Sequence, residues 1–222
     1  LLKYWDISVS KDGKVSKNIT AKFINGYVPK YSKEDSGEDN LNRLLFGEKS
    51  DKKKEELFDM IKDDLPKTFH HIAKYAINPT GQSGKFTGVE AIGVLKADID
   101  NLGMIFACGI KKERNSLSRL STMSRQVNHF FSIYLPYVLS TKEEFRNIYT
   151  VFAGGDDLFL IGPWNRIVEF TVFLKDRFNE YVCGNSQITL SAGISVNKPG
   201  EPVKHISERA ENALSKAKEN MV

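Results

Sequence analysis

The sequence predicts an α+β fold, in which an antiparallel or mixed sheet carries helices on one face. Two observations lead to this class. Beyond residue 90 the expected elements run strand, helix, strand, strand, helix, strand, helix, and only the two adjacent strands are joined by a tight turn. The composition supports a sizeable core, because 41% of the 222 residues are hydrophobic and 14 are Phe.

The strands and helices of this pattern are assigned from periodicity. Strands are expected at residues 91–99, 148–153, 158–161 and 187–196, and helices at 116–139, 165–181 and 203–220. The first of these helices repeats apolar residues at steps of three and four, which predicts one buried face. That face comprises Leu117, Leu120, Met123, Val127, Phe130 or Phe131, and Tyr134.

Residues 1–80 are predicted to form an appendage, joined to a domain at 81–222 through the turn-rich stretch 78–84. Alternation predicts β-structure over residues 1–31, and the charged, Ser- and Gly-rich stretch 32–54 is typical of a mobile loop. Two short helices should follow. One carries Leu57, Ile61 and Leu65 and ends at Pro66, and the other runs from Phe69 to Ala76.

The charge and cysteine content narrow the class of protein. With 32 Lys+Arg against 28 Asp+Glu, the net charge of +4 permits contact with phosphate but does not identify a nucleic-acid binder. No apolar run approaches the ~20 residues that span a bilayer, so no membrane partner is expected. Cys108 and Cys183 are predicted to be reduced thiols of a cytoplasmic protein. Because the chain begins without Met, we expect a piece of a longer polypeptide.

Carboxylates gather at the predicted ends of two strands. Asp98 and Asp100 should share one face of the first strand, while Asp156 and Asp157 lie at the tip of the hairpin. Ionised carboxylates repel one another, so such a group needs a compensating charge. Divalent metal supplies it, since Mg²⁺ is commonly held by one or two carboxylates and the phosphates of a substrate.

Two glycines precede the hairpin carboxylates. Gly154 and Gly155 lack a Cβ, which allows a positive φ and lets a nucleotide approach the backbone. Each motif alone also has a plain structural explanation, because Gly-Gly-Asp commonly closes a hairpin and Asp-x-Asp commonly caps or is solvated. On the long helix, Arg119 and Arg125 are interpreted as solvated or ion-paired, with a phosphate contact as the alternative.

Four motifs, taken in order, resemble palm nucleotidyl cyclases. Leu95-Lys96-Ala97-Asp98-Ile99-Asp100-Asn101-Leu102-Gly103 resembles their first strand, and Gly154-Gly155-Asp156-Asp157 their signature hairpin. Residues 188–194 resemble the Ser-x-Gly strand of GGDEF-type cyclases, and residues 210–218 their closing helix. The residues of these motifs are most similar to those of the large subunit of type III CRISPR effector complexes, in the type III-A (Csm) branch. The resemblance implies a ferredoxin-like palm.

The resemblance also implies a site. Asp98, Asp156 and Asp157 would be catalytic and would ligate two Mg²⁺ or Mn²⁺ ions, with help from the carbonyl of Ile99. Asp100 is a further candidate ligand, with a structural hydrogen-bonding role as the alternative. Lys218 would meet the triphosphate of ATP, and Gly154 and Gly155 would border the nucleotide.

The activity implied by the resemblance is conversion of ATP to cyclic oligoadenylates when target RNA is bound. The implied partners are other subunits of a crRNA-guided complex, crRNA and target RNA through that complex, and a second palm of the same polypeptide. Many large subunits of this family carry an N-terminal HD nuclease domain. This chain contains no His-Asp dipeptide, so we expect no DNase activity from it. Two alternatives stay open: a non-catalytic scaffold palm, and a diguanylate cyclase, against which Asp157-Leu158 in place of Glu-Phe argues.

Overall fold

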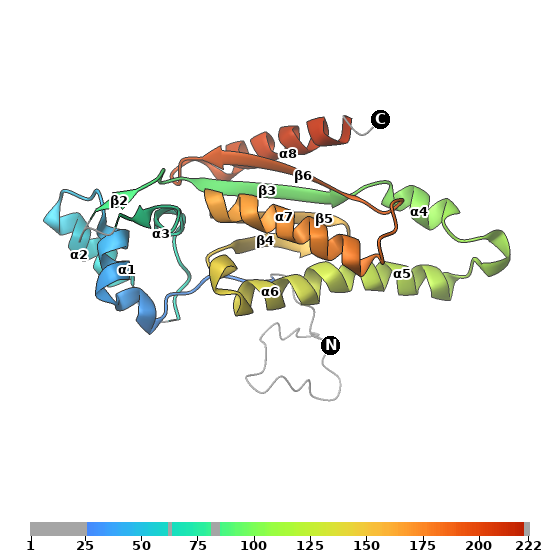
Figure 1. Ribbon diagram of the computed structural model, residues 1–222, viewed down its shortest axis with the longest axis horizontal. Helices are drawn as coiled ribbons and strands as arrows, with labels where there is room; N and C mark the ends of the chain where they lie inside the picture. Colours follow the sequence, from blue (N-terminus) through green and yellow to red (C-terminus); the bar gives the residue numbers. More distant parts are fainter. Residues whose placement is uncertain (1–25, 62–63, 81–84, 220–222) are drawn as a thin grey trace, which may run out of the picture.

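A four-stranded antiparallel sheet, in the order β4-β5-β3-β6, forms the centre of the computed structural model (Figure 1). The structure describes residues 26–61, 64–80 and 85–219. Its strands are β3 (Ile92–Ile99), β4 (Tyr149–Gly154), β5 (Asp157–Pro163) and β6 (Leu190–Asn197). The sheet was predicted at these places. The β-structure expected over residues 1–31 lies outside the described residues up to residue 25, and within 26–31 the structure has only an isolated bridge between Lys30 and Pro66.

The central strand β3 is buried on both faces. Leu95 lies opposite Leu160 of β5 and Ile194 of β6, and Leu95, Ala97 and Ile99 all belong to the larger apolar core. Ile92 and Val94 belong instead to a second core. Because side chains alternate along a strand, these two sets lie on opposite faces of the sheet.

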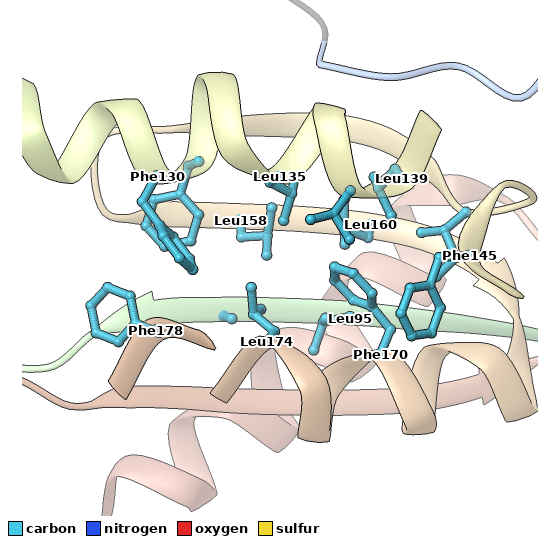
Figure 2. Packing of buried hydrophobic residues seen from close by; sticks show 14 of the residues in the cluster. Leu95, Phe130, Leu135, Leu139, Phe145, Leu158, Leu160, Phe170, Leu174 and Phe178 are labelled. Carbon is cyan, nitrogen blue, oxygen red and sulfur yellow. The ribbon is translucent and has the colours of Figure 1, made fainter. Parts of the chain in front are cut away.

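Two long helical segments cover the face that carries Leu95. One is built of α5 (Leu117–His129), the π-helical turn η3 (Phe130–Tyr134) and α6 (Leu135–Thr141). The other is α7 (Trp164–Tyr181). Figure 2 shows the aromatic and leucine side chains of the two helical segments pointing toward one another and toward β3 and β5. They include Phe130, Leu135 and Leu139 from the first segment and Phe170, Leu174 and Phe178 from α7.

The π-turn η3 begins with two buried aromatic residues. Phe130 and Phe131 are adjacent in sequence, yet both are almost fully buried, at 1% and 0% exposed. Both belong to the π-turn, where the extra residue shifts the register of the side chains along the helix. The alternative left open by the sequence, Phe130 or Phe131, is therefore resolved as both.

The opposite face of the sheet is covered by α8 (Val203–Glu219) and the short helix α3 (Phe69–Lys74). Ile206 and Ala210 of α8 pack with Ile72 of α3, Val94 and Ile161 in the second core. The α+β class and the ferredoxin-like arrangement are confirmed. The helix pair of that unit lies on one face as predicted, and the closing helix adds a layer on the other.

Two features between β3 and α6 were not predicted. The helix α4 (Leu102–Cys108) and the short turn η2 (Lys112–Arg114) occupy a stretch that carried no assignment. The prediction of a buried face along all of 116–139 is wrong for its first half, because α5 has no buried residue and Leu117 is 81% exposed. Leu120 and Met123 are only partly buried, and Val127 is the first residue of the helix to pack against the larger core.

The prediction of a mobile loop at residues 32–54 is wrong. This stretch forms η1 (Lys33–Ser36), α1 (Glu38–Leu45) and the start of α2 (Asp51–Met60). Leu44 is fully buried, and the buried Asp35 carboxylate orders the first turn by accepting hydrogen bonds from the backbone and hydroxyl of Ser32. The composition of this stretch suggested a loop because its few buried residues, such as Asp35 and Leu44, are dispersed among exposed charged residues.

The next two predicted helices differ in accuracy. The helix expected to reach Leu65 ends at Met60, and Asp64 has a positive φ of 69°, which a continuing helix does not allow. Leu65 is consequently 47% exposed. The helix expected from Phe69 is present as α3, capped by the Thr68 hydroxyl, which accepts a hydrogen bond from the backbone N–H of His71. A two-stranded ribbon of β1 (Asn78–Pro79) and β2 (Phe86–Thr87) then leads to the sheet.

A buried ion pair lies within residues 26–80, and its lysine also bonds to Asn147, just before β4. The Lys67 ammonium lies 2.7 Å from the Asp35 carboxylate and donates to Asn147 at 2.9 Å and to the Tyr75 hydroxyl at 3.0 Å. Both charged side chains are at most 3% exposed. Burial would raise the pKa of Asp35, but hydrogen bonds from Lys67 and Tyr75 outweigh it and hold that pKa below its ordinary value.

Replacing Lys67 by Met should destabilise the chain strongly, because the Asp35 carboxylate would remain buried without its cation. We expect the free energy of unfolding to fall by about 3–5 kcal/mol, measured by urea denaturation. The matched control is Lys30→Met, which removes an ion pair with Asp64 whose side chains are 50% and 83% exposed and should cost no more than about 1 kcal/mol. Equal losses for the two variants would contradict this account.

Candidate active site

The hairpin between β4 and β5 presents the first two carboxylates. Gly154 pairs with Asp157, which leaves Gly155 and Asp156 as the two turn residues. Gly155 has a φ of +66°, a conformation that glycine adopts without strain. Its backbone N–H donates to the side-chain oxygen of Asn128 at 3.2 Å, so α5 fixes the position of the turn.

Strand β3 brings the third carboxylate to the same end of the sheet. Asp98 lies directly opposite Asp157 in the antiparallel ladder, and the backbone N–H of Ile99 donates to the carbonyl of Asp156 at 3.3 Å. The ladder therefore assembles Asp98, Asp156 and Asp157, which the sequence placed in one site.

Helix α8 adds a cation to this group. The Lys218 ammonium donates a hydrogen bond to the Asp98 carboxylate. Partial burial would lower the pKa of Lys218, but the bond to Asp98 and the nearby charges of Asp100 and Asp157 outweigh it and raise that pKa. Lys218 thus stays protonated and partly neutralises the acidic end of the sheet.

The position of Lys218 depends on Gly193 in β6. A Cβ at residue 193 would lie 2.1 Å from the backbone nitrogen of Leu214 and 2.5 Å from the carbonyl oxygen of Ala210. Helix α8 therefore rests with its backbone directly on the strand, which only glycine allows. Gly193 pairs with Lys96, two residues before Asp98, so this close contact positions the last turns of α8 over the site.

The carboxylate of Asp157 is repelled by the negative charges around it. Partial burial and the like charges of Asp98 and Asp156, with a further contribution from Glu211, raise the pKa of Asp157 above its ordinary value. Lys218 opposes the shift without cancelling it. The protein therefore holds an acidic site that would be relieved by added positive charge.

Asp100 has different surroundings. It is 5% exposed, its carboxylate accepts a hydrogen bond from the Thr189 hydroxyl at 2.7 Å, and its backbone N–H donates to the Thr189 carbonyl at 3.0 Å. These bonds join the end of β3 to the loop before β6. Asp100 serves the structure here, and its role as a ligand stays a prediction.

The donor set suits a hard divalent cation that shares its ligands with a substrate. Within the described residues, no group of three or more His, Cys, Asp or Glu side chains is arranged to hold a metal by itself. Mg²⁺ does not need such a cage, since one or two carboxylates and substrate phosphates suffice. Asp98 and Asp157 lie opposite each other and the pKa of Asp157 is raised, so these two carboxylates are the candidates for such a partial site.

Comparison with known proteins identifies the fold unit. Residues 91–221 match the family model described as Cas10/Cmr2, second palm domain. The chain belongs to the Cas10/Cmr2 family. That range contains all four strands of the sheet, the acidic hairpin and α8. The family resemblance read from the motifs is confirmed.

Several relatives of this chain carry the name CRISPR system single-strand-specific deoxyribonuclease Cas10/Csm1 (subtype III-A). The protein of Methanocaldococcus jannaschii is 37% identical over 145 residues, which is 61% of this chain and 18% of that protein. The protein of Streptococcus thermophilus is 33% identical over 153 residues, 67% of this chain and 19% of that protein. The type III-A branch is thus confirmed, and the chain spans about a fifth of these relatives' length.

Solved structures show the same fold. Csm1 of Thermococcus onnurineus aligns over 94% of this chain and 25% of its own, with a TM-score of 0.64 and 23% identity. A Csm1-Csm4 cassette in complex with cA4 aligns over 71% of this chain and 22% of its own, with a TM-score of 0.57 and 26% identity. The same kind of cassette in complex with AMPPNP gives a TM-score of 0.58 at 27% identity, covering 71% and 22%.

Other observations complete the site. Among the described residues, no helix combines the length and the apolar composition that a membrane span needs. Cys108 and Cys183 are both free and exposed. Sequence reasoning missed the support given by Asn128, Thr189 and the contact at Gly193, because none of these residue types stands out before the elements are packed. The Ser-x-Gly motif was the one signal that pointed to Gly193.

Replacing Gly193 by Ala should push α8 away from β6, because the new Cβ would overlap the backbone of α8. We expect a loss of about 1–3 kcal/mol in the free energy of unfolding, measured with urea. The matched control is Gly103→Ala in α4, where a Cβ would have no atom within 4 Å and stability should hold or rise slightly. A stable Gly193→Ala variant would show that α8 does not rest on the strand.

Replacing Asp157 by Asn should make the metal-free chain more stable at neutral pH. Because the pKa of Asp157 is raised on folding, the folded state binds the proton more tightly, and its free energy of unfolding falls as pH rises above the ordinary Asp value. The variant lacks this fall. Urea denaturation between about pH 3 and pH 7 measures it, with the exposed Asp176→Asn of α7 as control. A larger fall in the Asp157→Asn variant would refute the charge crowding.

Proposed function

We propose that this chain is the catalytic palm of a type III-A large subunit, which converts ATP to cyclic oligoadenylates when target RNA is bound. The observation that carries the proposal is the pairing of Asp98 with Asp157 across the ladder, beside the turn residue Asp156 and the Lys218 ammonium. Carboxylates held close together repel one another, and a palm that served only as a scaffold would have no use for such an arrangement. The Csm1-Csm4 cassettes solved with cA4 and AMPPNP add support from relatives.

The proposed reaction is an in-line nucleotidyl transfer. The 3′-hydroxyl oxygen of one ATP forms a bond to the α-phosphorus of another, the bond from that phosphorus to the bridging oxygen breaks, and pyrophosphate leaves. The proton of the hydroxyl passes to solvent or to a carboxylate of the site. When bound, two Mg²⁺ or Mn²⁺ ions would supply activation of the hydroxyl and neutralisation of charge on pyrophosphate.

The residues of the chain have separate tasks in this proposal. Asp98, Asp156 and Asp157 hold positive charge at the reacting phosphate, with the Ile99 carbonyl and Asp100 as further candidates for the same role. Lys218 exchanges its bond to Asp98 for the triphosphate, to which an ammonium binds as a point charge. Gly154 and Gly155 let the nucleotide approach the backbone of the turn, since a Cβ on Gly155 would have no atom within 4 Å.

The proposed partners are those of the family. A second palm of the same polypeptide would hold the other ATP, and crRNA, target RNA and other effector subunits would switch the activity. We therefore propose that the isolated chain binds nucleotide weakly and is nearly inactive.

Replacing both Asp156 and Asp157 by Ala should abolish synthesis. The test uses the full-length protein assembled with its guide RNA and a matching target RNA, supplied with ATP or GTP and Mg²⁺ or Mn²⁺, with products read by mass spectrometry. We expect cyclic adenylates from ATP and a loss of at least about a hundredfold in the double variant, because charge stabilisation worth several kcal/mol is removed.

The matched control is Asp39→Ala with Asp176→Ala, which removes two exposed carboxylates outside the site and should keep full activity. Cyclic diguanylate from GTP would replace the proposal with the diguanylate cyclase. No product from a correctly assembled complex would favour the scaffold palm.

A further inference from the structure

The excess positive charge of the chain is concentrated in one segment. We define the arm as residues 102–129, which comprise α4, η2 and α5. It contains five Lys and Arg residues and one acidic residue, Glu113, a net charge of +4. The whole chain has 32 cations and 28 anions, so the remainder has 27 of each and no net charge. The cations of the arm are Lys111, Lys112, Arg114, Arg119 and Arg125.

These cations are available to an external anion. All nine residues from Lys111 to Arg119 are exposed, as is Arg125. None of the five cations forms an ion pair with any residue that the structure describes, although twelve other Lys and Arg side chains of the described part do. The side-chain contacts that they make within the chain are local: Arg119 donates to the Arg114 carbonyl at 2.9 Å and Arg125 to the Thr122 hydroxyl at 3.4 Å.

The arm also stands apart from the body of the molecule. Figure 1 shows α4 and the first half of α5 extending past the end of the sheet. Within α4, η2 and α5 no residue is buried. Such a projection gives an extended partner room to lie along it on more than one side.

The polar residues between the cations suit phosphate. Hydroxyl and amide side chains bind phosphate oxygens along with Lys and Arg, and such contacts need no base sequence. Exposed residues of this kind follow η2 and continue along α5 on both sides of Arg119, and they are Asn115, Ser116, Ser118, Ser121, Thr122, Ser124 and Gln126. A nucleic-acid backbone presents phosphates at regular intervals, which matches cations and hydroxyls spread along one segment of the chain.

We propose that the arm binds the sugar–phosphate backbone of a nucleic acid, independently of its base sequence. For Arg119 and Arg125 the proposal takes the alternative that the sequence left open, a phosphate contact. The five cations are not among the residues of the acidic site, which come from the ends of β3, β4, β5 and α8; the arm meets that site only at its last turn, where Asn128 bonds to Gly155. The proposal does not rest on the proposed synthesis, since binding is measured without ATP or divalent metal.

The test measures binding of a fluorescein-labelled 20-nucleotide single-stranded RNA, and of DNA of the same sequence, to the full chain by anisotropy across a salt series. Each phosphate contact on a single strand contributes about −0.7 to the slope of log K against log salt, so five contacts give about −3.5. The triple variant Lys111→Gln, Lys112→Gln, Arg114→Gln should reduce that slope to about −1.4. These three side chains take part in no bond that their removal would break within the described residues.

The matched control neutralises three exposed lysines elsewhere, Lys33→Gln, Lys175→Gln and Lys198→Gln, and should leave the slope as in the parent chain. Circular dichroism confirms that both variants fold. Equal slopes for the two variants would overturn the proposal, as would a slope near zero in the parent chain. Preference between the RNA and the DNA probe identifies the natural source of the backbone.

A second readout locates the contact directly. RNA carrying 4-thiouridine should cross-link to peptides that contain residues 111–125. Cross-links confined to α8 and the acidic hairpin would overturn the proposal, because they would assign the binding to the nucleotide site. Protection of the arm by a protein subunit in the RNA-free complex would also overturn it and would make this surface a protein interface.

Discussion

The close contact between α8 and β6 at Gly193 is the constraint on which the site depends. Without a Cβ at that position the helix backbone rests on the strand, and the last turns of α8 then carry Lys218 to the Asp98 carboxylate. The ladder in turn sets Asp98 against Asp157. Packing on one face of the sheet thus supplies the cation, and backbone pairing within the sheet supplies the carboxylates.

The sheet and its site were predictable because the evidence for them is local. The strand at Ile92–Ile99 and the hairpin around Gly154-Gly155 carry strong alternation and a turn whose chemistry needs glycine. The resemblance of the motifs to palm cyclases assigned the three carboxylates to one site, and the antiparallel pairing of the structure sets Asp98 opposite Asp157. What the sequence could not supply was the support: Asn128 beside Gly155 and Thr189 beside Asp100 meet only after helices and strands pack.

The errors share a physical cause, which is that composition reports averages while folding depends on single anchors. Residues 32–54 read as a loop, yet one buried carboxylate at Asp35 and its Lys67 partner are enough to order helices on either side. The opposite error occurred in α5, where apolar spacing was taken as proof of burial although Leu117 is exposed. Periodicity shows which residues share a face, and it does not show what covers that face.

Helix α5 connects the two surfaces of the chain. Its first half belongs to the exposed basic arm, and near its other end Asn128 accepts a hydrogen bond from the turn of the acidic hairpin. Helix continues through the π-turn into α6, whose Leu135 and Leu139 are locked in the core, so that end cannot shift freely. Asn128 therefore holds Gly155 from the point where the exposed part of α5 meets the part that packs on the core.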